Sequence, residues 1–217
     1  MQAAAQPKQY LEVAGRTLIE WALAPFLARE DCAGLIVVLD AEDEHWGRLA
    51  IAADPRIATV AGGTERADSV RAGLIALGAR AQEDDWVLVH DAARPCLPAA
   101  DLERLLATLW DDAVGGLLAA PLVDTVKRAD DGGRVERTMP RTALWRALTP
   151  QMFRYGVLVK ALEAAAAARR EVTDEAQAVE EMGLRPRLVE GSSDNLKVTL
   201  PSDIERVRRI LGEQPEP

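Results

Sequence analysis

The residues best suited to chemistry lie at the end of an apolar run near the middle of the chain. Residues 86–89 are typical of a strand buried on both faces, and His90, Asp91 and Arg94 follow it. In open α/β sheets, ligands bind beyond the carboxyl ends of the strands, where backbone groups are free to face them. There a carboxylate can hold Mg²⁺ with substrate phosphates, and an arginine can form paired hydrogen bonds to phosphate oxygens.

An internal ion pair between Asp91 and Arg94 explains the same spacing equally well, because structural ion pairs also occur at strand ends. We interpret His90 as a packed histidine at the strand end rather than as a catalytic base.

A glycine-rich segment, residues 62–70, follows a predicted strand at 57–60 and precedes a predicted helix. Its glycines, Gly63 among them, and the amides at the helix start could approach a ligand closely. The residue types alone favour a simpler interpretation, a turn in which Asp68 or Ser69 caps the helix.

Two lysines are candidates for holding an anion. Lys8 is equally well explained as a solvated side chain. Lys197 lies between Leu196 and Val198, and a strand that turned it inward would need an anion to offset its desolvation.

Thr125, Arg141 and Thr149 have the side chains that commonly bind phosphate, hydroxyls and a guanidinium. Nothing in their spacing shows that the three meet in space.

The elements that must position these residues alternate between strand and helix. Strands are expected at 35–40, 57–60, 86–90, 116–120 and 188–190. Helices are expected at 67–77, 98–110, 154–170 and 201–211, and one more helix is expected to begin after Thr173, its N-cap. This order predicts an α/β fold, a Rossmann-like doubly wound sheet that is mostly parallel.

The alternation breaks after Pro121. Residues 123–128 and 134–138 alternate in polarity about a turn at 130–133, which predicts a β-hairpin arm over about 122–145. Because an isolated hairpin is marginal in water, we expect this arm to pack against a second copy of the chain in a homodimer.

Composition limits the remaining possibilities. The 217 residues suit one domain, 1–217, with a frayed tail at 213–217. A net charge of −9 argues against a nucleic-acid partner, and two cysteines are too few for a disulfide framework. No apolar stretch is long enough to span a membrane, and the N-terminus does not resemble a signal peptide, so we expect a soluble, cytoplasmic protein.

Together these segments resemble the 2-C-methyl-D-erythritol 4-phosphate cytidylyltransferase family nearly end to end. The matching segments, in order, are PKQYL at 7–11, GGTERADSV at 62–70, VHDAARP at 89–95, DTVK at 124–127, LTPQ at 148–151, TDEA at 173–176 and DNLKVT at 194–199.

The resemblance implies transfer of CMP from CTP to 2-C-methyl-D-erythritol 4-phosphate, with release of pyrophosphate and help from Mg²⁺. It implies catalytic roles for Lys8, Asp91 and Lys197, with Asp91 at the metal. The implied nucleotide-binding residues are Lys8, Gly63, Ser69, Asp91 and Ala92. The implied substrate-binding residues are Asp91, Arg94, Thr125, Arg141, Thr149 and Lys197, of which Thr125 and Arg141 would reach the neighbouring subunit's pocket.

The start of the chain departs from the family pattern. Members begin with a buried strand and a glycine-rich loop that ends in an arginine and a methionine; this sequence begins at that methionine. We therefore expect the first strand and phosphate loop to be absent, the sequence to be an N-terminally shortened record, and this form to be inactive or poorly folded.

Three other functions remain open from the sequence. The chain could act on another polyol phosphate such as ribitol 5-phosphate, transfer a uridylyl or adenylyl group, or be a catalytically silent dimeric binding protein. Residue types that bind phosphate do not by themselves identify the polyol.

Overall fold

A mixed four-stranded sheet forms the centre of the computed structural model, which describes residues 7–212. Its order is β10-β6-β9-β5. The strands are β5 (Trp86–Val89), β6 (Gly115–Pro121), β9 (Trp145–Arg154) and β10 (Arg187–Glu190). β10 runs parallel to β6, whereas β9 runs antiparallel to both β6 and β5.

A separate parallel pair consists of β3 (Leu35–Leu39) and β4 (Ile57–Ala61). No strand within residues 7–212 hydrogen-bonds to β3 and β5 together, so the two sheets are separate. The predicted α/β class is confirmed. The sequence did not predict the antiparallel direction of β9, which follows from chain connectivity: β9 returns from the arm directly beside β6.

Six α-helices surround these strands in the described part of the chain. They are α1 (Leu18–Leu27), α2 (Arg66–Leu77), α3 (Ala99–Leu109), α4 (Tyr155–Ala167), α5 (Glu175–Glu181) and α6 (Pro201–Gly212). Short elements connect them: the 3₁₀ helices η1 (Lys8–Tyr10), η2 (Trp46–Arg48) and η3 (Ala50–Ala53), and the strands β1 (Glu12–Val13) and β2 (Arg16–Thr17). None of the helices in residues 7–212 is long and apolar enough to cross a bilayer.

The core lies on both faces of the four-stranded sheet, because successive strand residues point to opposite faces. Leu118 and Met152 pack with leucines of α3 on one face. Their chain neighbours Leu117 and Phe153 pack with residues of α4 and α5 on the other. Helices on both faces are the arrangement expected of a doubly wound fold.

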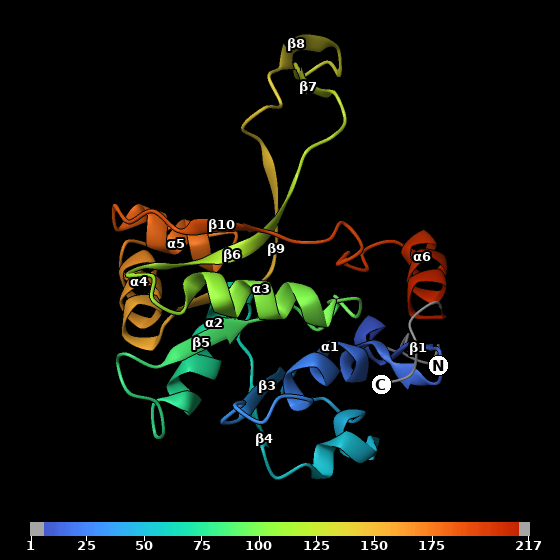
Figure 1. Cartoon of the computed structure of the whole chain (residues 1–217), viewed down its shortest axis with the longest axis vertical. Coiled ribbons are helices and arrows are strands. Elements are labelled where there is room, and N and C mark those ends of the chain that lie inside the picture. The colour runs from blue at the N-terminus through green and yellow to red at the C-terminus, as the bar shows by residue number, and fades with distance from the viewer. Residues whose placement is uncertain (1–6, 213–217) are drawn as a thin grey trace.

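The hairpin is present and projects away from the body of the molecule, at the top of Figure 1. Its strands are β7 (Val126–Ala129) and β8 (Val135–Met139), paired antiparallel. Gly133, in the turn, has a φ of 74°, a conformation that glycine adopts without strain.

One predicted helix start was wrong by a residue. Asp174, and not Thr173, is the N-cap of α5, and its carboxylate accepts a hydrogen bond from the Gln177 amide at 2.8 Å. Asp174 also accepts from Gln151 of β9, so tertiary contact selects the capping residue. The predicted tail at 213–217 lies outside the described residues.

Candidate functional site

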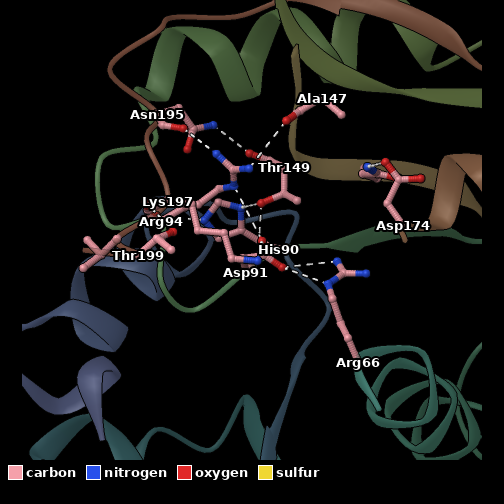
Figure 2. Close-up of polar contacts among 12 residues, drawn as sticks. Arg66, His90, Asp91, Arg94, Ala147, Thr149, Asp174, Asn195, Lys197 and Thr199 are labelled. Atoms are coloured by element: carbon pink, nitrogen blue, oxygen red, sulfur yellow. Dashed lines mark hydrogen bonds and ion pairs between the residues drawn. The ribbon is translucent and has the colours of Figure 1, made fainter. Parts of the chain in front are cut away.

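Asp91 is the centre of a charged group just beyond β5 (Figure 2). One carboxylate oxygen accepts from Arg66 Nε at 3.2 Å, and the other lies 2.9 Å from Lys197 Nζ and 3.6 Å from Arg94 Nε. These cations come from α2, from the segment after β10 and from the loop after β5 itself. The fold therefore brings Arg66 and Lys197, which are far apart in the sequence, to the same carboxylate as the nearby Arg94.

Electrostatics keep Asp91 ionised. Burial raises its pKa, since the side chain is only 13% exposed, but the nearby Arg66 and Lys197 outweigh burial and hold the pKa at about 2. Arg66 also pairs with the buried Glu175, through contacts of 2.6 and 3.1 Å. The group thus has three cations and two carboxylates, a net positive site in a chain of net charge −9, as an anionic substrate requires.

Arg94 is anchored by main-chain carbonyls as well as by Asp91. Its guanidinium donates to the Asn195 carbonyl at 2.8 Å and to the Ala147 carbonyl at 3.5 Å. Burial lowers its pKa, with Asp91 acting in the opposite direction. Both earlier interpretations are therefore compatible with the structure: Arg94 forms an internal ion pair, and it retains unused N–H donors that a phosphate could accept.

Thr149 is buried beneath Asp91. Its hydroxyl accepts from the Asp91 amide at 3.1 Å and lies 2.9 Å from Nδ1 of His90. The Thr149 carbonyl accepts from the Asn195 side chain at 2.6 Å. The predicted packed role of His90 is supported, because its other ring nitrogen, Nε2, lies 3.1 Å from the Arg94 carbonyl.

A hollow of about 450 Å³ opens where β3 and β4 end, and Gly62, Gly63, Thr64 and Ser69 line it. The Gly63 amide donates to the Ser69 hydroxyl at 3.2 Å. No side chain caps the N-terminus of α2, so the predicted capping by Asp68 or Ser69 was wrong: Ser69 bonds to the glycine loop instead. Gly63 cannot accept a Cβ without movement, because that atom would lie 2.4 Å from Asp68 Cβ.

Both candidate lysines lie near one another. Lys8, in η1, donates to the carbonyl of Val198 at 3.0 Å, directly after Lys197. The segment around Lys197 is irregular rather than a strand, and the Lys197 side chain is 41% exposed. The anion that it was expected to need is Asp91, supplied by another part of the chain.

The two arm residues are not brought to this site. Thr125 and Arg141 are exposed near the base of the arm, and Arg141 donates to the Val123 carbonyl. Within residues 7–212 no hydrogen bond or ion pair joins either residue to Asp91 or its cations. Ala92 follows Asp91 in the same turn and is partly buried.

The sequence analysis assigned no role to Arg66, Glu175 or Asn195. All three lie inside segments that carried the family resemblance, which was the available signal. Their roles depend on pairings between distant segments, such as Arg66 with Glu175, 109 positions apart, and spacing does not predict such pairings.

A metal would have Asp91 as its protein ligand. No group of three metal-binding His, Cys, Asp or Glu side chains occurs in the described part of the chain. Mg²⁺ is often bound through one or two carboxylates together with substrate phosphates, so a single ionised Asp91 fits Mg²⁺ delivered with a nucleotide. It does not fit a cage built from protein alone.

Comparisons with known proteins agree with one another. The family model described as 2-C-methyl-D-erythritol 4-phosphate cytidylyltransferase matches residues 1–213. A protein of that name from Ectopseudomonas mendocina is 56% identical over 98% of this chain and 91% of its own length, and one from Pseudomonas putida is 54% identical over 95% and 88%.

Solved structures of proteins with the same activity in their names are also similar to this chain. A 4-diphosphocytidyl-2C-methyl-D-erythritol synthase has a TM-score of 0.85 and 42% identity, covering 94% of each chain. The 2-C-methyl-D-erythritol 4-phosphate cytidylyltransferase of Francisella tularensis has a TM-score of 0.83 and 32% identity, covering 94% of this chain and 93% of its own.

Proposed function

Since this chain belongs to the 2-C-methyl-D-erythritol 4-phosphate cytidylyltransferase family, we propose that its site transfers CMP from CTP to 2-C-methyl-D-erythritol 4-phosphate and releases pyrophosphate. The observation that carries the proposal is the cationic group around Asp91 beside the hollow at Gly63 and Ser69. The cationic group suits the triphosphate of a nucleotide, and the hollow suits its base.

The reaction needs no protein nucleophile. A phosphate oxygen of the polyol attacks the α-phosphorus of CTP, and the bond to the pyrophosphate leaving group breaks. Two anions must meet in line, so catalysis depends on positioning and on cations that stabilise the transition state. Lys197 is well placed for this, since its ammonium is held beside Asp91 at 2.9 Å yet remains partly exposed.

The proposal keeps the residue roles that the family resemblance implies. On the nucleotide side, Gly63 and Ser69 contact the base, Lys8 holds the triphosphate, and the Asp91 to Ala92 turn approaches the α-phosphate. On the polyol side, Arg94 and Lys197 bind the phosphate, with Thr149 beneath them. The Thr149 hydroxyl already contacts His90, so it donates to a phosphate only if that contact breaks.

Mg²⁺ is the proposed cofactor, with Asp91 as its protein ligand. When bound, it would supply positive charge to the triphosphate and to the leaving pyrophosphate. The low pKa of Asp91 supports this role, because the carboxylate is ionised and can bind a cation at any physiological pH.

We also propose a homodimer in which the arm brings Thr125 and Arg141 to the partner's pocket. Support comes from the arm itself: it projects from the body, and Val123 and Val135 on it are 73% and 64% exposed. We infer that these apolar side chains belong to a surface that a second copy covers. A cytoplasmic location stays a prediction from composition.

The test is an assay of the purified chain with Mg²⁺, CTP and each polyol phosphate, measuring pyrophosphate release and the mass of the product. A relative named 2-C-methyl-D-erythritol 4-phosphate cytidylyltransferase matches 98% of this chain and 91% of its own length, so in place of the inactive form expected from the start of the sequence we expect turnover of methylerythritol phosphate with CTP. UTP and ATP should support little turnover, and EDTA should abolish activity until Mg²⁺ is restored. Turnover of ribitol 5-phosphate alone, or binding without turnover, would favour the alternatives, which the named relatives do not support.

A further inference from the structure

His90 contacts both ends of the turn that carries Asp91 and Arg94. Nε2 lies 3.1 Å from the Arg94 carbonyl, and Nδ1 lies 2.9 Å from the Thr149 hydroxyl, which accepts from the Asp91 amide. The Arg94 amide in turn donates to the Asp91 carbonyl at 2.9 Å, closing the turn. The ring also packs against Phe26, with centroids 5.3 Å apart, which restricts its rotation.

The direction of each hydrogen bond follows from the group that Nε2 faces, the Arg94 carbonyl. A carbonyl oxygen can only accept, so Nε2 carries a proton. In a neutral imidazole that carries its proton at Nε2, the other ring nitrogen, Nδ1, is an acceptor. The Thr149 hydroxyl must then donate to Nδ1, which leaves its oxygen to accept from the Asp91 amide.

These three hydrogen bonds can all form at once only with one ring orientation and one tautomer of His90. If the ring flipped, carbon atoms would face the Arg94 carbonyl and the Thr149 hydroxyl. If it changed tautomer, an unprotonated Nε2 would face the carbonyl and the Thr149 hydroxyl would lose its acceptor. Unpaired groups in a partly buried site are costly, so the whole chain of bonds is held together.

We propose that His90 is a positioning residue for nucleotidyl transfer: through Thr149 and the Arg94 carbonyl it fixes the turn that presents the Asp91 carboxylate to the nucleotide and the Arg94 guanidinium to the polyol phosphate. His90 itself touches neither substrate. The inference rests on the proposed roles of Asp91 and Arg94.

Half-isosteric substitutions test each end separately. His90→Asn keeps an amide oxygen near the position of Nδ1, and His90→Gln keeps an amide N–H near Nε2, whereas His90→Ala removes both. We expect His90→Ala to lower kcat about tenfold, the effect of losing one or two positioning hydrogen bonds, with the KM for CTP changed less than about twofold. Asn and Gln should each recover part of that loss.

A double-mutant cycle with Thr149→Val tests the route through the hydroxyl. If His90 acts through Thr149, the double variant His90→Gln with Thr149→Val should be no slower than the slower single variant, because His90→Gln already removes the acceptor at Nδ1. Additive losses would overturn the route, and an unchanged kcat in a folded His90→Ala protein would overturn the proposal. His45→Gln is the matched control, because His45, the only other histidine in the sequence, stacks on Tyr10.

A spectroscopic test depends neither on activity nor on whether the His90 variants fold. Long-range ¹H–¹⁵N spectra of the imidazole nitrogens identify the tautomer, and with two histidines the assignment needs only the His45→Gln protein. We expect His90 protonated at Nε2 alone at pH 7, and a proton at Nδ1 would overturn the inference. An inactive wild type that shows the expected tautomer would instead count against the proposed function.

Discussion

At the scale of single residues, Asp91 organises the site. It is an ionised carboxylate held between Arg66, Lys197 and Arg94, and its amide is held by Thr149. An ion pair buried to this degree has a large desolvation cost that only well-placed partners offset. The same cations that stabilise Asp91 are the ones assigned to the substrate phosphates in the proposed function, so under that proposal this residue links stability to function.

The first residue-scale prediction concerns stability against pH. The pKa of Asp91 is about 2 in the folded protein, below its unfolded value, so its ionised form stabilises the fold above about pH 5 and that contribution is lost as pH falls towards 2. Relative to Asp91→Asn, wild type should be more stable by about 2 kcal/mol at pH 7, with the difference shrinking by pH 3. Urea unfolding at both pH values measures this.

The exposed Asp131, in the turn of the arm, provides the control for that experiment. Asp131→Asn should leave stability unchanged at either pH. A wild-type advantage over Asp91→Asn that does not depend on pH would contradict the electrostatic explanation.

The second residue-scale prediction concerns Gly63. A Cβ there would lie 2.4 Å from Asp68 Cβ, so Gly63→Ala must displace the loop that lines the proposed base pocket. We expect the KM for CTP to rise about tenfold while the KM for the polyol phosphate changes little. Gly47→Ala is the control, since nothing lies within 4 Å of its added Cβ; equal effects of the two changes would argue against the pocket.

At the scale of elements, each site residue depends on where its strand or helix ends. β5 ends at Val89, so the side chains that follow it leave the sheet and face β9 itself and the segment after β10. α2 begins at Arg66, which directs that side chain towards Asp91, while α5 begins beside Glu175. The site is therefore assembled at the starts and ends of elements, as expected of an open α/β sheet.

A prediction at this scale tests the start of α5. Asp174 caps the helix and also accepts from the buried Gln151 side chain. Thr173 instead donates, from its amide and its hydroxyl, to the side-chain oxygen of Gln177 at an exposed site. Asp174→Ala should lower the free energy of unfolding by about 1 kcal/mol or more, and Thr173→Ala by much less. Denaturant midpoints of the two variants decide this, and equal losses would contradict the assignment of the cap.

At the scale of the whole molecule, the arm and the division of the sheet are the features that matter. The arm projects from the body with apolar side chains exposed on it (Figure 1). The β3 and β4 pair lies apart from the four-stranded sheet within the described residues. Each feature leads to a measurable property of the intact chain.

The proposed dimer should depend on the apolar surface of the arm. Val123→Asp combined with Val135→Asp should shift the mass in solution from dimer to monomer, as measured by light scattering, because charges would be buried in the interface. Ile75→Asp changes a side chain that is equally exposed, at 73%, but lies on α2. A mass unaffected by the arm variants, or wild type that is already monomeric, would exclude this interface.

The divided sheet should show in hydrogen exchange. β9 lies between two strands, whereas β3 has β4 as its paired strand among those described. Amides of β3 and β4 should therefore exchange at a lower free energy of opening than those of β6 and β9. Equal protection across both sheets would show that they open as one unit.

Much of the element order followed from the sequence, for physical reasons that are local. Aliphatic runs such as 35–39 and 115–121 leave strand as the simplest structure, and the alternating segments about 130–133 are close enough in sequence to pair across their own turn. β9 was missed because Pro150 within it is a usual sign of a break in a strand.

The residue types of the site, and its place at a strand end, were determined by the sequence alone. The tertiary structure decided which of them meet: it made Asp91 the anion that Lys197 needs, added Arg66 and Glu175, joined His90 to Thr149, and left Thr125 and Arg141 on the arm. The reason is that hydrophobic periodicity specifies elements over a few residues, whereas polar contacts across 58 to 109 positions depend on how those elements pack.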